Sequence, residues 1–322
     1  MKSHSIRLAL FSIAIVSTLI LTPFEAQAMP KTARIGFLMS GSGSSARIDS
    51  FRTEFLKLGY VEGKNVTFET RAAKLSYDQL PALADELVRL KVDVIVTPGA
   101  NDTRAAKNAT KTIPIIFLGT VSDPVSLGLV ESLARPGGNI TGFTTIGSVL
   151  TGKRLELLKD VIPGLSRVTL LWNPQNTGSA QVWQESQVAA KELGLQLHSM
   201  AVKSGDKIES AFEQAVKARS GALAMTGGGL IATLEKMIIA LAAKNRLPAI
   251  FGSNATVANG GLMSYGLDEI EPYRRPAVMV DKILKGAKPG DLPVKQPDEV
   301  RARAQSQNCK ADWVKHSTDY LR

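Results

Sequence analysis

Short polar segments rich in glycine, serine, threonine and asparagine are the parts of this sequence best suited to bind a small molecule. Six of them each follow an apolar run, at residues 40–45, 98–101, 119–123, 173–179, 227–229 and 253–256. In open α/β sheets, ligands collect at the carboxyl ends of the strands. From these segments and the one around residue 265 we select twelve candidate binding residues: Ser40, Gly41, Ser42, Gly99, Asn101, Ser122, Asp123, Asn176, Thr177, Gly228, Asn254 and Tyr265.

Two of these candidates have a structural alternative. Asp123 is the only acid in the six segments. It either caps the helix expected to begin at Pro124 or pairs with a ligand ammonium group. Tyr265 either lines the site or packs at the point where the chain crosses between lobes. Helix N-termini at Asn101 and after Ser122 and Ser179 are expected to supply unpaired backbone N–H groups, which suit a carboxylate.

The same segments argue against catalysis and against a bound cofactor or metal. None of them contains histidine or cysteine, and the three histidines and the single Cys309 are far apart in sequence, so no zinc site is expected. The Gly41-Ser42-Gly43 run resembles a dinucleotide fingerprint but lacks the acidic residue that should end the second strand. We therefore expect a binding protein; an exported α/β enzyme and a ligand-sensing module are the alternatives.

The elements that position these segments alternate between short apolar runs and amphipathic helices, which is typical of βαβ units. The pattern predicts two Rossmann-like lobes joined by a hinge, with a ligand cleft between them: residues 29–145, then 146–268, then a return to the first lobe at 269–297 through a helix at Tyr273–Leu284. The expected crossings are Gly142–Leu150 and Gly266–Pro272. Strands are expected at Arg34–Met39, Asn65–Ala72, Val92–Thr97, Ile113–Leu118, Ile140–Thr144, Arg167–Trp172, Leu195–Val202, Ala222–Thr226, Pro248–Gly252 and Gly261–Tyr265, and a long helix at Leu230–Lys244.

The N-terminus has the pattern of a removable signal peptide. Lys2 and Arg7 precede an apolar run, Leu8–Leu21, which is too short to span a membrane. Ala26-Gln27-Ala28 then forms a small-x-small motif. We expect cleavage near Ala28/Met29 and a periplasmic protein. The formal charge of +10 is spread along the chain, so we expect no nucleic-acid partner.

Several long phrases of the chain match a known family. They lie at residues 58–66, 123–125, 132–142, 153–159, 246–250 and 280–289, and include Leu58-Gly59-Tyr60-Val61-Glu62-Gly63 and Arg135-Pro136-Gly137-Gly138-Asn139. With these phrases the chain resembles the ABC transporter substrate-binding proteins of the tryptophan/tyrosine-importer type, which have the type I periplasmic-binding fold. The resemblance implies a two-lobed protein that captures a small organic solute, such as an amino acid, and delivers it to ABC permease membrane subunits. It implies contact with the membrane only through that permease, and no reaction of the ligand.

Residues 298–322 depart from this family, whose members usually continue after Pro297 with a final strand and helix. Codons allowed for Asp298–Cys309, shifted forward by one base, can spell the usual continuation. We interpret the tail as the product of a frameshift; genuine divergence is the alternative. A frameshift is expected to remove the terminal strand and to leave a sheet edge or an apolar face uncovered, with an unstable or inactive protein as the consequence.

Overall fold

The computed structural model describes residues 32–41, 46–119, 123–267, 271–298 and 300–304. The expected signal peptide and the candidate residues Ser42 and Ser122 lie outside these ranges. None of the helices in the described part of the chain has the length and apolar character needed to cross a bilayer.

The first lobe is built on a five-stranded parallel sheet in the order β2-β1-β3-β4-β5. The strands are β1 (Ala33–Met39), β2 (Val66–Ala72), β3 (Val94–Thr97), β4 (Ile115–Leu118) and β5 (Ile140–Phe143). Every residue of β3, β4 and β5 is buried, as is usual for parallel strands covered on both faces. The central strands therefore appear in the sequence as continuous apolar runs.

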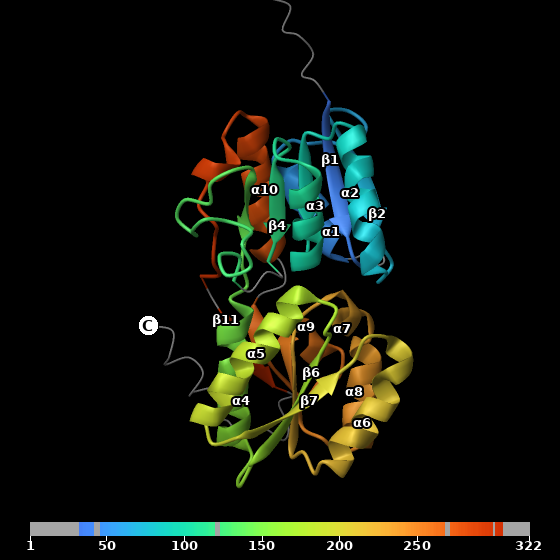
Figure 1. The fold of residues 1–322 in the computed structure, drawn as a ribbon, viewed down its shortest axis with the longest axis vertical. Coiled ribbons are helices and arrows are strands. Elements are labelled where there is room, and N and C mark those ends of the chain that lie inside the picture. The colour runs from blue at the N-terminus through green and yellow to red at the C-terminus, as the bar shows by residue number, and fades with distance from the viewer. Residues whose placement is uncertain (1–31, 42–45, 120–122, 268–270, 299, 305–322) are drawn as a thin grey trace, which may run out of the picture. The chain divides into compact units, whose positions relative to one another are not determined.

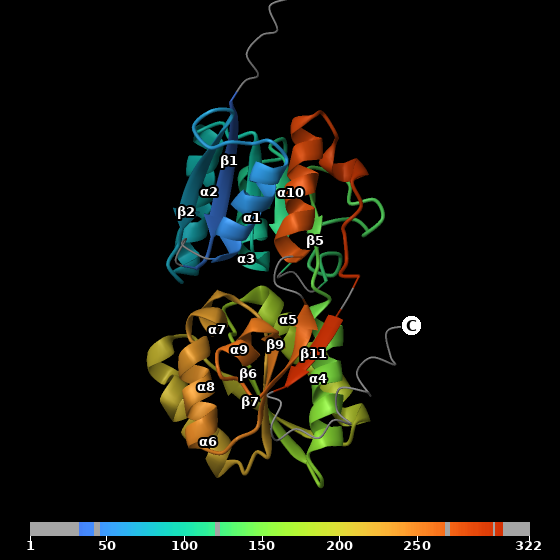
Figure 2. The same ribbon diagram turned by 180° about the vertical axis from the view of Figure 1, so that it is seen from behind.

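Helices cover both faces of this sheet. On one face lie α1 (Ala46–Lys57) and α10 (Glu271–Leu284), which share a core with β1 and β4. On the other face lie α2 (Leu80–Arg89), preceded by the short η1 (Tyr77–Gln79), and α3 (Ala100–Ala109). Figures 1 and 2 show these two helical layers from opposite sides. The expectation that the helix near residues 273–284 packs on the first lobe is confirmed.

The second lobe has a six-stranded sheet in the order β11-β10-β9-β8-β6-β7. The strands are β6 (Arg167–Trp172), β7 (Gln196–Ala201), β8 (Ala222–Met225), β9 (Ala249–Ser253), β10 (Met263–Leu267) and β11 (Val300–Ala304). All neighbouring strands are parallel except β10 and β11.

Helices cover both faces of the second sheet. One face carries α4 (Gly147–Val161) and α5 (Thr177–Glu192); the other carries α6 (Ile208–Lys217), α7 (Gly229–Thr233) and α8 (Glu235–Lys244). The short helices are α9 (Ala255–Ala258), η2 (Gly205–Lys207) and η3 (Pro289–Asp291).

The chain passes between the two sheets three times. It leaves the first sheet after β5, returns after β10 to form α10, and leaves again after η3 to form β11. Beside the first crossing, Thr144 N–H donates to the Lys295 carbonyl (2.9 Å) and Lys295 N–H donates to the Gly142 carbonyl (2.9 Å). The first and third crossings therefore run side by side, where the sequence indicated only two crossings.

Three expectations about individual elements are corrected. The segment expected to be a linker from Gly142 to Leu150 contributes the first turn of α4, because Leu150, Leu155 and Leu158 bury one side of a helix in the second core. The single helix expected at Leu230–Lys244 is two helices, interrupted at Leu234.

The third correction concerns the tail. Val300 is buried in the second core, Ala302 and Ala304 pack against that core, and the intervening Arg301 and Arg303 are exposed. This two-residue alternation is that of an edge strand with one buried face. The prediction that the altered tail leaves the sheet edge without a strand is therefore wrong, since β11 pairs antiparallel with all of β10.

Candidate functional site

In the first lobe, backbone hydrogen bonds join the segments that follow β1 and β2, next to the expected site. The Ser40 carbonyl accepts a hydrogen bond from Leu75 N–H (2.6 Å), and the Gly41 carbonyl accepts one from Lys74 N–H (3.2 Å). Lys74 and Leu75 both have positive φ, which forms a tight turn after β2. Ser40 is buried, and Leu75 packs against the core of the second lobe.

The segment at residues 98–101, which follows β3, contacts the second lobe at the start of α3. Gly99 is its N-cap, and its carbonyl accepts bonds from the N–H and the hydroxyl of Thr103. The Asn101 side chain reaches across the lobes: its Nδ2 donates to the Gln175 carbonyl (2.9 Å), and its Oδ1 accepts from Thr177 N–H (2.8 Å). Asn101 therefore joins the start of α3 to the start of α5.

In the second lobe, Asn176 caps α5 by accepting a hydrogen bond from Ser179 N–H (2.8 Å). The Ser179 hydroxyl in turn bonds the Thr226 hydroxyl (2.6 Å), which links the segments after β6 and β8. Gly228 has φ +132° and ψ 163°, a conformation essentially restricted to glycine. A β-carbon at the neighbouring Gly229 would lie 3.7 Å from Gly41 Cα of the first lobe.

The remaining candidates have mainly structural contacts. Asp123 accepts hydrogen bonds from Val125 N–H (2.9 Å) and Ser126 N–H (3.1 Å). The helix expected to begin at Pro124 is absent, since residues 124–128 form turns, so Asp123 stabilises a local turn and does not cap a helix. Tyr265 packs in the second core, and its carbonyl accepts from Arg154 Nε (2.8 Å). Asn254 is buried; its Oδ1 accepts from the Ser264 hydroxyl (3.0 Å), and its Nδ2 has no hydrogen-bond partner.

Two residues at the contact between the lobes were missed by the analysis of the sequence. Tyr77 lies in η1, and its hydroxyl accepts from Asn173 Nδ2 of the second lobe (3.4 Å). Burial raises the pKa of Tyr77, the nearby Asp102 raises it further, and the side chains of Asn176 and Ser40 lower it in part. Asp102 is fully buried in the first turn of α3. It directly follows the Pro98–Asn101 segment, so an extension of that segment by one residue would have included it.

Burial governs the chemistry of Asp102. It raises the pKa of the carboxyl to about 7, although the Ser40 hydroxyl and the backbone of Ser40 and Gly99 lie close enough to lower it in part. None of these groups reaches normal hydrogen-bond distance and angle, since neither carboxylate oxygen has a partner. Among the described residues, no group of three or more His, Cys, Asp or Glu side chains could hold a metal ion.

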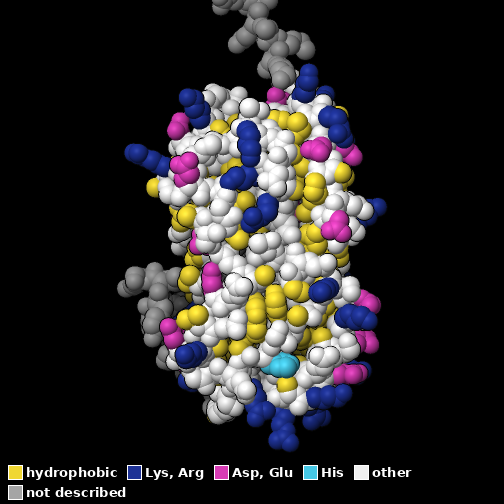
Figure 3. All heavy atoms as spheres, in the orientation of Figure 1, with side chains coloured by type: hydrophobic (Ala, Val, Ile, Leu, Met, Phe, Trp, Pro, Cys, Tyr) yellow, Lys and Arg dark blue, Asp and Glu magenta, His cyan; other side chains and the backbone are white. Residues whose placement is uncertain are grey.

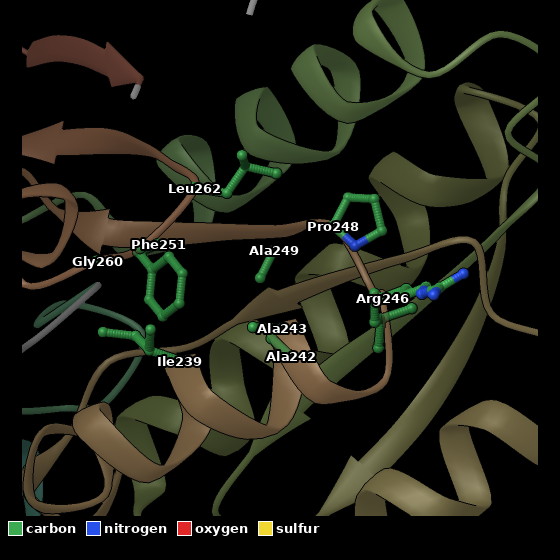
Figure 4. A pocket seen from close by; sticks show the side chains of 11 residues that line it. Ile239, Ala242, Ala243, Arg246, Pro248, Ala249, Phe251, Gly260 and Leu262 are labelled. Carbon is green, nitrogen blue, oxygen red and sulfur yellow. The ribbon is translucent and has the colours of Figure 1, made fainter. Parts of the chain in front are cut away.

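A separate pocket of about 290 Å³ lies on the α8 face of the second sheet (Figure 4). Its walls are mostly apolar and come from α8, β9 and the adjoining turns, including Ile239, Ala242, Phe251 and Leu262. It contains none of the candidate residues. Pro248 and Ala249 place it toward the amino end of β9, whereas ligands of such sheets bind at the carboxyl ends of the strands.

The surface seen in Figure 3 has basic and acidic side chains interspersed on both lobes. A binding face for nucleic acid would concentrate Lys and Arg. On this face the charge therefore has the pattern of an ordinary solvated surface.

Comparison with known proteins identifies the family. Residues 34–304 match the family of ABC transporter substrate binding proteins. The chain belongs to this family. A protein named tyrosine-binding protein, from Clostridioides difficile strain R20291, is 27% identical over 280 residues, which are 85% of this chain and 80% of that protein. The ABC transporter substrate-binding family consists of binding proteins and is not an enzyme family.

Solved structures show the same two-lobed fold. A conserved domain protein from Vibrio cholerae has a TM-score of 0.81 at 24% identity, with 88% of this chain and 98% of that chain covered. An ABC domain from Streptococcus pneumoniae, in complex with L-Trp, has a TM-score of 0.79 at 22% identity with the same coverage. The predicted α/β architecture, two lobes of the type I periplasmic-binding kind, is thereby confirmed.

Proposed function

We propose that this substrate-binding protein captures an aromatic amino acid, tyrosine or tryptophan, and delivers it to the membrane permease of an ABC importer. The observation that carries the proposal is the 27% identity with the tyrosine-binding protein over 280 residues of this chain. The fold shared with a tryptophan-bound domain agrees with it.

The contacts between the lobes support a site at this place. Asn101, Tyr77 and Leu75 of the first lobe contact the second lobe at Gln175, Thr177, Asn173 and the α7 region. A solute bound among these segments would touch both lobes and favour the arrangement in which they meet. The proposed contact residues are Ser40, Gly41, Gly99, Asn101, Asn176, Thr177, Gly228 and Asn254.

The proposal includes the cellular location. A signal peptide of residues 1–28, removed near Ala28/Met29, would release the protein into the periplasm, where the closed, loaded form meets the permease. The basic N-terminal residues, the apolar run and the Ala26-Gln27-Ala28 motif support it.

Calorimetric titration of residues 29–322 with tyrosine, tryptophan and phenylalanine tests the ligand class, with leucine, glutamate and uracil as controls. Binding of one aromatic amino acid with unaltered ligand recovered afterwards is the expected result, and the transition temperature should rise by several degrees at saturation. Binding restricted to a control compound would overturn the aromatic class. Consumption of the ligand would instead favour the enzyme alternative.

A further inference from the structure

Asp102 has an unmet requirement for hydrogen-bond donors. The residue is 0% exposed, and both carboxylate oxygens lack a partner. No Lys or Arg among the described residues forms an ion pair with it, and no charged side chain contributes to the shift of its pKa. A buried carboxylate in this condition is unfavourable unless a proton or a cation neutralises it.

The position of Asp102 in its helix explains only part of its presence. An acid in the first turn of a helix interacts favourably with the helix dipole. That interaction is available to an exposed acid as well, and it is weaker than the cost of burying an unpaired charge. Full burial with two unpartnered oxygens therefore needs another explanation.

The surroundings of Asp102 place it where a ligand held by both lobes would lie. The preceding residue, Asn101, bonds the Gln175 carbonyl and Thr177 N–H of the second lobe. Tyr77, which is near enough for Asp102 to influence its pKa, accepts a hydrogen bond from Asn173 of that lobe. The carboxylate is thus buried in the first lobe, next to two residues that bond to the second lobe.

We infer that Asp102 binds the ammonium group of the ligand, so that the solute of this protein must carry a cationic nitrogen. An ammonium group supplies the N–H donors and the positive charge that the two carboxylate oxygens lack. The inference rests on the proposed function and adds to it the group that recognises the ligand. In the second lobe, a hydrogen-bond donor lacks an acceptor: the buried Nδ2 of Asn254 has no partner. An α-amino acid carries both groups that are missing, an ammonium donor and a carboxylate acceptor.

Matched ligands and matched variants test this role by calorimetric titration of residues 29–322 at pH 7.5. The ligands are L-tyrosine, tyramine, which lacks the carboxylate, and 3-(4-hydroxyphenyl)propionate, which lacks the nitrogen; leucine, lysine and putrescine extend the panel to other cations. The variants are Asp102→Asn, which keeps the shape of the side chain, and Asp85→Asn, which removes an exposed acid of α2. Thermal unfolding of each variant shows that it is folded.

The expected result is binding of tyrosine, with binding of the nitrogen-free analogue and binding by Asp102→Asn both weaker on the order of 100-fold. Asp85→Asn should bind as the wild type does. Equal binding of the nitrogen-free analogue, or undiminished affinity in folded Asp102→Asn, would overturn the inference and leave the solute-binding function intact. Binding of a non-aromatic amine that depends on Asp102 would overturn the aromatic class and support the inference. If no cationic compound binds, the inference is wrong.

Discussion

Gly266 in β10 is the position at which the structure most clearly requires glycine. A β-carbon there would overlap the carbonyl oxygen of Gly252 in the neighbouring β9. The two strands also change register between Ser264 and Leu267, which brings their backbones close at this point. Only glycine fits without a backbone shift.

Gly266→Ala is therefore expected to lower the free energy of unfolding by about 1–3 kcal/mol or more, as overpacked cores do. Gly227→Ala is the matched control, because a β-carbon at Gly227 meets no atom within 4 Å and its φ is not positive. The control should stay within about 1 kcal/mol of the wild type. Urea denaturation of both variants measures the difference; equal stability of the two would contradict the close approach of β9 and β10.

Asp102 also predicts how the ligand-free protein responds to pH. Because burial raises its pKa to about 7, the folded protein holds a proton at pH values where the unfolded chain has lost it. The Asp102 contribution to stability is thus largest near pH 4 and falls as the pH rises to about 7. Tyr77, the titratable neighbour, stays protonated over this range because burial raises its pKa.

Asp102→Asn should remove this contribution. The wild-type free energy of unfolding, minus that of the variant, is expected to decrease between pH 4.5 and pH 7.5 in urea titrations. Asp85→Asn is the control, because it removes an acid from an exposed position of α2. Parallel pH profiles for the wild type and Asp102→Asn would show that the carboxyl is not held protonated.

The sequence could place the strand-end segments but could not show that Asp102 is buried. Its neighbours Ser40 and Tyr77 come from distant parts of the sequence, after β1 and in η1. Asn101 was selected for its position after β3, whereas its hydrogen bonds to Gln175 and Thr177 depend on how the lobes meet. Asp123 was the more visible acid, and its contacts lie within a local turn.

At the scale of elements, apolar runs predicted the buried strands well because parallel strands are apolar on both faces. Helix α4 was not expected from the sequence, and its first turn was assigned to a crossing because Gly147, Ser148 and Thr151 are typical of a loop. That turn is helical because the helix buries Leu150 in the second core. Strand β11 was missed because its apolar positions are one valine and two alanines.

Removing β11 should destabilise the second lobe. A chain ending at Asp298 loses the strand that covers the edge of β10 and the buried Val300. We expect a lower transition temperature and concentration-dependent aggregation through the open edge. A chain ending at Ala304 keeps all of β11 and is the control. Similar stability and solubility of the two truncated chains would show that the altered tail contributes nothing to the fold.

At the scale of the whole molecule, we expect Asn101 to couple ligand binding to the contact between the lobes. Asn101→Ala removes two hydrogen bonds to the second lobe, and each is worth about 0.5–1.5 kcal/mol. We expect about 5- to 100-fold weaker binding of the proposed ligand, measured by calorimetry. Asn108→Ala, an exposed position on the same helix, should leave affinity unchanged. Loss of affinity in both variants would point to a general effect on α3.

The packing of α10 against α1 has a consequence for the order in which the protein can be made. Helix α1 ends at Lys57, but the helix that covers its face of the sheet begins only at Glu271, after the entire central part of the second lobe. A growing polypeptide therefore leaves the core that Phe37 and Phe51 share with α10 incomplete until almost the whole chain has been synthesised. The N-terminal portion therefore cannot complete its core on the ribosome before α10 has been made.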